Sequence, residues 1–137
     1  MLDTGPLGMI AHPRPNPEIT QWLRDLLSCS ATIIIPEIAD YELRRELILN
    51  GLQPSLDRLD ELKQSMRYCP ISTDTMLQAA EFWAQCRRQG RPTGDPKELD
   101  GDAILAAQAK IADAVIATEN VGHLSLFVEA RDWQEID

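Results

Sequence analysis

The chain has 137 residues, of which 44% are hydrophobic and 26% are charged. This composition is typical of one globular domain over residues 1–137 and excludes a disordered or fibrous protein. The net charge of −9, from 22 acidic and 13 basic residues, excludes a protein that coats nucleic acid non-specifically, because basic side chains supply most of that affinity.

The three cysteines, Cys29, Cys69 and Cys86, are odd in number and far apart, so they predict neither a disulfide framework nor a zinc site. A reducing compartment follows, and we expect a cytoplasmic protein. We expect no secretory signal, and apolar runs such as 31–36 are too short to span a bilayer. No association with membranes is therefore expected.

Along the first half of the chain, short apolar runs alternate with segments whose apolar residues are spaced as in a helix. Residues 1–3 predict the end of a strand, which the Gly5-Pro6 pair interrupts. Apolar side chains at helical spacing over 19–27 predict an amphipathic helix. The β-branched run 31–35 predicts a strand that is buried on both faces. Further helices are predicted over 36–50 and 54–66.

The second half continues the alternation. Strands are predicted over 67–71, 114–118 and 133–136. Helices are predicted over 73–90 and 100–112, with an exposed loop over 91–99 that contains two prolines and a glycine. The helix 73–90 is expected to bury Met76, Ala79, Ala80, Trp83 and Cys86. Strands that alternate with helices in this way predict a parallel α/β sheet covered on both faces.

Ligands of open parallel sheets bind beyond the carboxyl ends of the strands. Asp3 ends the first predicted strand, and Asn120 follows the strand 114–118, so both are expected at that edge. The alternative is that each is a turn residue that bonds its own backbone.

Two acids lie within the apolar arc of the helix 37–49, whereas Asp40, Tyr41, Arg44 and Arg45 lie mainly outside it. An inward carboxylate needs a compensating partner. Glu42 is therefore either a functional residue or half of an internal salt bridge, and Glu46 is expected to be structural.

Asp102 lies in the first turn of a predicted helix that is apolar on nearly every side. It is either a site residue or a carboxylate stabilised by the helix dipole, and Asp100 has the same alternatives in a more exposed position. Carboxylates that converge without histidine or cysteine predict Mg²⁺ or Mn²⁺, which commonly act on phosphate esters. His12 and His123 are expected to be surface or capping residues.

Four segments carry a resemblance to a known family: Leu2-Asp3-Thr4, the segments 36–43 and 102–109, and 117–120 with His123-Leu124. In this order and spacing the sequence resembles the PIN-domain family of metal-dependent ribonucleases, which includes the VapC toxins. The resemblance implies a PIN-like three-layer α/β/α fold with a central parallel sheet. Only two residues precede Asp3, whereas family members usually have a longer first strand.

The resemblance also implies an endoribonuclease that cleaves RNA with Mg²⁺ or Mn²⁺. The implied catalytic residues are Asp3, Glu42, Asp102 and Asn120, of which the three acids are also the metal ligands. Asn120 stands at the family's fourth acidic position, where it brings an oxygen but no charge. A homodimer and an antitoxin partner, as in a toxin–antitoxin pair, are further implications.

The alternative function is a PIN-fold interaction module that binds a protein partner with little or no turnover, which the missing fourth acid favours. If the chain cuts RNA, its candidates for phosphate contacts are Arg44, Arg45, Arg87, Arg88 and Arg91. The alternative for each arginine is an ordinary solvated surface charge.

Overall fold

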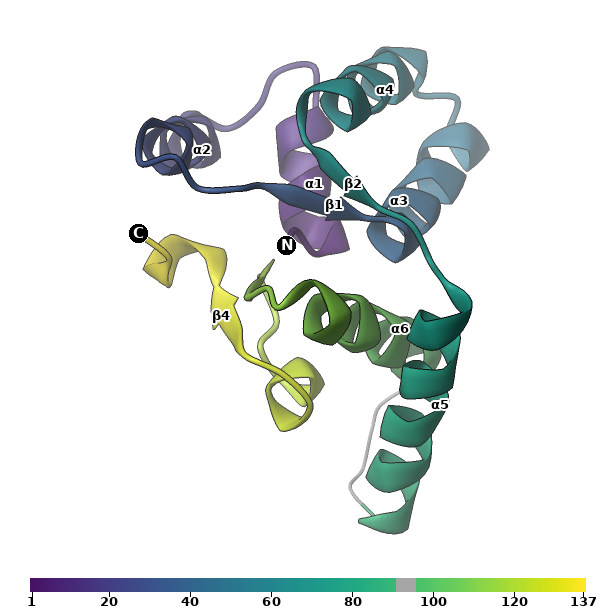
Figure 1. Cartoon of the computed structure of the whole chain (residues 1–137). Coiled ribbons are helices and arrows are strands. Elements are labelled where there is room, and N and C mark those ends of the chain that lie inside the picture. Colours follow the sequence, from purple (N-terminus) through teal and green to yellow (C-terminus); the bar gives the residue numbers. More distant parts are fainter. Residues whose placement is uncertain (91–95) are drawn as a thin grey trace.

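The computed structural model describes residues 1–90 and 96–137 of the chain, in which helices and short strands alternate (Figure 1). The helices are α1 (Thr4–Ala11), α2 (Pro17–Ser28), α3 (Glu37–Leu49), α4 (Gln53–Ser65), α5 (Thr73–Arg88) and α6 (Pro96–Ala112). The strands are β1 (Ile34–Pro36), β2 (Arg67–Cys69), β3 (Ile116–Thr118) and β4 (Ala130–Asp132). Two 3₁₀ turns, η1 (His123–Leu126) and η2 (Trp133–Glu135), flank β4.

Parallel pairing brings the carboxyl ends of the strands to one edge. β1 pairs with β2, and β3 pairs with β4, both in parallel. Residues 1–3 lie between the two pairs: the Leu2 N–H donates to the Ile34 carbonyl at 2.9 Å, and the Asp3 N–H donates to the Ala117 carbonyl at 3.0 Å. The order across the sheet is thus β2, β1, residues 1–3, β3, β4.

Both faces of this sheet are buried, because successive strand side chains point to opposite sides. Leu2, Ile33 and Ile35 pack in a core with side chains of α1, α2, α3 and α4. Ile34 and Ile116 pack in a second core with side chains of α6. The result is three layers, with α1, α3 and α4 on the side of the sheet opposite α6 (Figure 1). The predicted parallel sheet with helices on both faces is confirmed.

The first strand segment ends before Gly5-Pro6, as predicted, but these residues lie in the first turn of α1, a helix that the sequence analysis did not predict. Asp3 caps this helix, and its Oδ1 accepts the Thr4 N–H at 2.7 Å. Proline is tolerated in a first turn, where its missing N–H has no helical partner. The apolar residues Leu7 and Ile10 then bury one face of α1.

The buried face of α5 consists of other residues than the sequence predicted. Thr75, Ala79, Phe82 and Cys86 are the buried residues, whereas Met76, Ala80 and Trp83 are exposed. Thr75 is held inward by a reciprocal cap with Ser72, and Phe82 stacks on Phe127 with ring centroids 4.9 Å apart. These partners lie outside the helix, so its own periodicity does not reveal them.

Several boundaries also differ from the predictions: the strands predicted over 31–35, 67–71 and 114–118 are β1 at 34–36, β2 at 67–69 and β3 at 116–118. α6 starts at Pro96, so residues 96–99 are helical rather than part of a loop, and residues 91–95 of that loop lie outside the described part of the chain. The last strand is β4 at 130–132, and residues 133–135 form η2. None of the helices in 1–90 and 96–137 has the length and apolar character needed to cross a bilayer.

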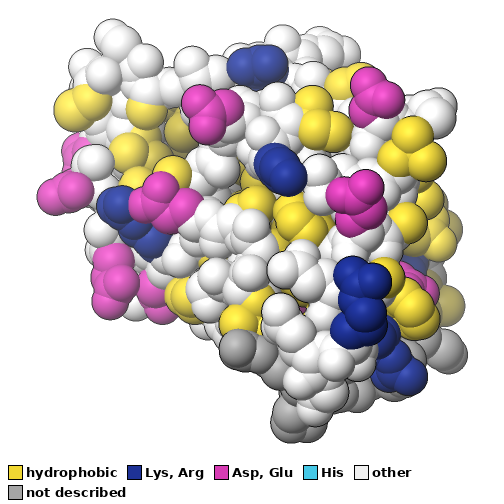
Figure 2. All heavy atoms as spheres, turned by 60° about the horizontal axis from the view of Figure 1, so that its bottom comes forward, with side chains coloured by type: hydrophobic (Ala, Val, Ile, Leu, Met, Phe, Trp, Pro, Cys, Tyr) yellow, Lys and Arg dark blue, Asp and Glu magenta, His cyan; other side chains and the backbone are white. Residues whose placement is uncertain are grey.

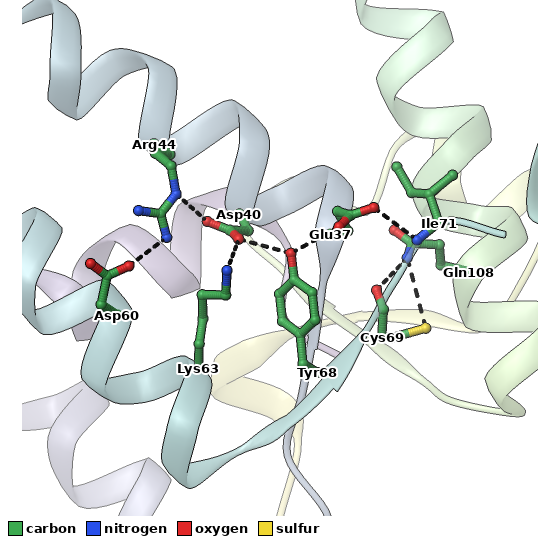
Figure 3. A network of polar contacts seen from close by, with 9 residues as sticks. All are labelled: Glu37, Asp40, Arg44, Asp60, Lys63, Tyr68, Cys69, Ile71 and Gln108. Carbon is green, nitrogen blue, oxygen red and sulfur yellow. Dashed lines mark hydrogen bonds and ion pairs between the residues drawn. The ribbon is translucent and has the colours of Figure 1, made fainter.

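A buried polar network corrects the orientation predicted for α3 (Figure 3). Asp40, expected outside the apolar arc, is only 4% exposed, whereas the apolar Leu49 at the end of the same helix is 78% exposed. The Asp40 carboxylate accepts from Arg44 Nε at 2.9 Å and from the Tyr68 hydroxyl at 2.8 Å, and it pairs with Lys63 Nζ at 3.0 Å. Burial by itself raises the pKa of Asp40, but these three partners outweigh it and hold the pKa below its ordinary value.

Gln108 of α6 joins three elements at the centre of the protein (Figure 3). Its side chain is fully buried; Oε1 accepts the Ile38 N–H at 3.2 Å, and Nε2 donates to the Cys69 carbonyl at 2.7 Å. Ile38 lies in the first turn of α3, whose N-cap is Pro36 and has no side-chain cap. Gln108 therefore satisfies a helix N–H that would otherwise be left without a partner.

We expect Gln108→Met to lower the free energy of unfolding by about 3 kcal/mol, because both the Ile38 N–H and the Cys69 carbonyl lose a buried partner. Methionine has a similar size and shape, so the change tests hydrogen bonding rather than packing. Urea denaturation measures the loss in the free energy of unfolding. Gln85→Met, at an exposed position of α5, is the matched control. A loss below about 1 kcal/mol would mean that water or a shifted backbone replaces the amide.

Candidate active site

A hollow at the carboxyl edge of the sheet is lined by side chains from five separate segments. Its lining residues are Asp3, Thr4, Gly5, Glu42, Glu98, Asp102, Asn120 and His123. The four residues predicted from the sequence, Asp3, Glu42, Asp102 and Asn120, are all among them. We call this hollow the acidic pocket.

Asp3 is oriented by two donors from neighbouring elements. Its Oδ1 accepts the Thr4 N–H at 2.7 Å, and its Oδ2 accepts the Thr118 hydroxyl at 2.7 Å. Thr118 is fully buried at the end of β3, and its Oγ1 also accepts the Asn120 N–H at 3.0 Å. Thr118 thus holds the Asp3 carboxylate and the Asn120 backbone together, a role that the sequence analysis did not assign.

Glu42 points from α3 into the acidic pocket and is half-buried. Its Oε1 accepts the Thr4 hydroxyl at 3.1 Å, and its Oε2 lies 4.0 Å from Arg45 Nη2. A Cβ added at Gly101 would lie 2.9 Å from Glu42 Oε2, so the absence of a side chain there makes room for this carboxylate. Burial and the charge of Asp3 raise the pKa of Glu42, against the opposing effects of Thr4 and Arg45.

Asp102 projects from α6 and carries a carboxylate that its surroundings disfavour. Burial, followed by the charge of Asp3, raises the pKa of Asp102 to about 6. Glu42 and Glu98 raise this pKa further, while His123, whose Nδ1 is 3.7 Å from Asp102 Oδ2, lowers it. Because α6 starts at Pro96, Asp102 lies beyond the first turn, and the prediction that it begins this helix was wrong. The helix dipole therefore does not explain its placement, since that effect is confined to the first turn.

The remaining sequence candidates lie outside the acidic pocket. Glu46 and Asp100 are exposed, and neither is among the lining residues. Glu119 is not a lining residue either; its carboxylate lies over Gly5, 2.6 Å from where a Cβ would be. Conversely, sequence reasoning missed Glu98, which it placed in a loop, and His123, which it assigned to the surface. Only the start of α6 at Pro96 reveals that Glu98 lies one helical turn before Asp102.

The candidate arginines differ in how far other groups already engage them. Arg44 pairs with both Asp40 and Asp60 at 2.9 Å, so its role is structural. Arg45 lies over the Tyr41 ring, 5.2 Å from its centroid, and contacts Glu42 of the acidic pocket without lining the pocket itself. Arg87 lies over Trp83 on α5, and Arg91 lies outside the described residues.

The donors of the acidic pocket are suited to a hard divalent cation. Carboxylates and the Asn120 amide offer oxygen atoms, which Mg²⁺ and Mn²⁺ prefer. Within 1–90 and 96–137, however, no three His, Cys, Asp or Glu side chains are grouped closely enough to form a ready-made ion site. The chemistry of the donors fits such a cation, and the meeting of all three carboxylates around one ion stays a prediction.

The fold and this pocket define a parallel α/β protein with an acidic site at the carboxyl edge of its sheet. The PIN domain matches residues 1–124, and the chain belongs to the PIN-domain family. It is 28% identical over 127 residues to toxin FitB of Neisseria gonorrhoeae (strain ATCC 700825 / FA 1090), which covers 89% of this chain and 88% of that protein.

Solved structures confirm the predicted PIN fold. The FitAcB crystal structure from Neisseria gonorrhoeae has a TM-score of 0.72 at 22% identity and covers 98% of both chains. VapBC2 from Rickettsia felis, bound to a DNA fragment from its promoter, has a TM-score of 0.79 at 19% identity and covers 97% of both chains. At these identities the likeness establishes the fold.

We expect the Asp102 carboxyl to favour the fold of the metal-free protein as the pH falls from 7 towards 5, whereas the buried Met1 amino group, whose pKa is lowered to about 6, opposes this effect. The pKa of Asp102 is about 6 in the folded state and 3.8 in its ordinary state. Ionised Asp102 therefore destabilises the fold above pH 6, and protonation between pH 6 and pH 4 removes that cost. Because its side chain is 32% exposed, solvent screening limits the gain to about 1 kcal/mol.

Urea denaturation in EDTA at several pH values measures this gain. Asp102→Asn should reduce it, whereas Asp100→Asn, an exposed control two residues away, should retain it. Asp40 does not interfere, because the lowered pKa of Asp40 means that its contribution is lost only below about pH 4. The same pH dependence of stability in Asp102→Asn and in the natural chain would contradict the assignment, because the opposing effect of Met1 is present in both.

Proposed function

We propose that this protein is an endoribonuclease that cleaves RNA phosphodiester bonds with Mg²⁺ or Mn²⁺. The observation that carries the proposal is the collection of Asp3, Glu42 and Asp102 in one pocket where the pKa values of Glu42 and Asp102 are raised. Acids that destabilise one another and the fold are typical of a functional site rather than of a structural ion pair. Membership of the PIN-domain family supports the same activity.

Each lining residue has a role that follows from its contacts. Asp3, oriented by Thr4 and Thr118, and Asp102 would hold the cation, which supplies a Lewis acid that activates water and stabilises the leaving oxygen. Glu42 completes the ligand set or orients the attacking water through its carboxylate, which the Thr4 hydroxyl fixes. Asn120 assists through its amide oxygen, without adding charge.

The proposal includes a protein partner. The curated relative is a toxin, FitB, and the structural neighbours are FitAcB and VapBC2. We propose by analogy that this chain is the toxin of a cytoplasmic toxin–antitoxin pair and that an antitoxin binds it.

A homodimer is the remaining part of the proposal. Hydrophobic side chains lie among both acidic and basic ones on the face at the bottom of Figure 1 (Figure 2). Met76, Leu77 and Trp83 of α5 are between 40% and 62% exposed. Such side chains are available for burial against a second copy of the chain.

The test is cleavage of single-stranded RNA by the purified protein with Mg²⁺, with Mn²⁺ and with EDTA. We expect cleavage only with an added ion, and we expect Asp102→Asn to abolish it, because the amide keeps the size of the side chain but removes the charge that the cation needs. The exposed control Asp100→Asn, like Glu46→Gln, should cost much less activity. Full activity in excess EDTA would overturn the proposal.

A catalytically weak interaction module is the second candidate, and Asn120 is the observation that favours it. The PIN-domain pattern has an acid at the position of Asn120. The amide leaves the acidic pocket with less negative charge, so the pocket binds the cation less tightly. In this case the fold would serve to bind the protein partner.

Asn120→Asp separates the two candidates. We expect the added carboxylate to tighten Mn²⁺ binding severalfold, measured by titration, and to increase turnover if occupancy limits it. Asn50→Asp at the exposed end of α3 adds the same charge away from the pocket and should change neither quantity. If neither the natural chain nor Asn120→Asp cleaves RNA with either ion, the interaction module becomes the better assignment.

A further inference from the structure

Two more hollows continue the acidic pocket along α1. The first shares Thr4 and Gly5 with the acidic pocket and passes Gly8 and Met9. It ends at His12, Arg14 and Asn16. The second shares His12 and Arg14 with the first and reaches the start of α4 at Pro54. These two hollows thus share lining residues with each other and with the acidic pocket, and we call them together the α1 groove.

The far end of the α1 groove carries positive charge, in contrast to the acidic pocket. Arg14 is exposed and forms no ion pair with any side chain in 1–90 or 98–137, whereas Arg44 and Arg131 are both paired. Arg58 of α4 lies close by, since its Nε donates to the Ile10 carbonyl of α1 at 2.8 Å. In a chain with a net charge of −9, this end is suited to an anionic ligand.

The segment that carries Arg14 is held in place. His12 caps the C-terminal end of α1, and its Nδ1 accepts the Arg14 N–H at 3.0 Å. Thr4 and His12 are eight residues apart along α1, a rise of about 12 Å, and Arg14 lies beyond His12.

We propose that the α1 groove binds the single-stranded RNA that flanks the scissile phosphate, with Arg14 contacting a backbone phosphate. This inference rests on the proposed function. A strand whose phosphate lies at the acidic pocket has to continue over a neighbouring surface, and the α1 groove leads from that pocket to a cation that no described acid neutralises. Single-strand sites commonly combine such a channel with arginine.

The first experiment measures binding of a single-stranded RNA of about twelve nucleotides to Asp102→Asn protein in Mg²⁺, by fluorescence anisotropy over a range of salt concentrations. Adding Arg14→Gln should weaken binding about fivefold and reduce the slope of log K against log salt by about 0.7, the value for one phosphate contact on a single strand. Arg24→Gln on exposed α2 removes the same charge outside the α1 groove and should leave the slope unchanged.

The second experiment measures kcat/KM of the natural chain. Arg14→Gln should lower kcat/KM on the long RNA but not on an RNA of about three nucleotides, which is too short to reach Arg14.

Absence of cleavage by the natural chain would defeat the proposed function, and the binding experiment would still test the α1 groove. Equal salt slopes for Arg14→Gln and Arg24→Gln would overturn the inference. Loss of binding to a co-purified protein partner, with RNA affinity unchanged, would assign the α1 groove to that partner instead and would also overturn it.

Discussion

Three residues at the start of the chain hold the two halves of the sheet together. Met1, Leu2 and Asp3 bond to β1 on one side and to β3 on the other, and Leu2 is only 1% exposed. Because every strand is parallel to this segment, the carboxyl ends meet at one edge, and Asp3 is placed there as the last residue of the central segment. The acidic pocket therefore exists only because this short segment is inserted between β1 and β3.

The carboxylates of Asp40 and Asp102 are both largely buried, but their electrostatic surroundings are opposite. Asp40 is surrounded by Lys63, Arg44 and Tyr68, and the pKa of Asp40 is lowered. Among the side chains of 1–90 and 98–137, Asp102 has no comparable partner: His123 lies 3.7 Å away, and burial together with the charges of other acids raises the pKa of Asp102 to about 6. The cations and the hydroxyl around Asp40 stabilise the fold. The charge of Asp102 destabilises the fold, and a bound cation would neutralise it.

The relative position of α3 and α6 links these features. Gln108 ties α6 to the first turn of α3 through Ile38, and Gly101 lets the Glu42 carboxylate approach α6 closely. Ile38 and Glu42 are four residues apart, on one side of α3. The buried Gln108 amide and the absence of a side chain at Gly101 thus act on the same two helices, α3 and α6. Together they set how close Glu42 comes to Asp102.

Local pattern was enough to place the candidate site residues at one edge of the sheet. The β-branched run 31–35 predicts a strand buried on both faces, and Ile33, Ile34 and Ile35 do pack alternately into two cores. Position at a strand end or within an apolar helix placed Asp3, Glu42, Asp102 and Asn120 at one edge, and all four line the acidic pocket. These predictions succeed because burial and strand direction are encoded in neighbouring residues.

The tertiary structure alone decided the burial of Asp40, the buried face of α5 and the recruitment of Glu98 and His123. In each case the deciding partner comes from another element: Lys63 and Tyr68 for Asp40, Phe127 for Phe82, and the acidic pocket itself for Glu98. A helical wheel counts hydrophobicity and assigns a carboxylate to solvent, but it contains no information about a cation from a distant segment. The sequence by itself therefore determined that Asp3, Glu42 and Asp102 stand at the edge of the sheet, while long-range contacts added Glu98 and decided which buried carboxylates are neutralised and which remain charged against one another.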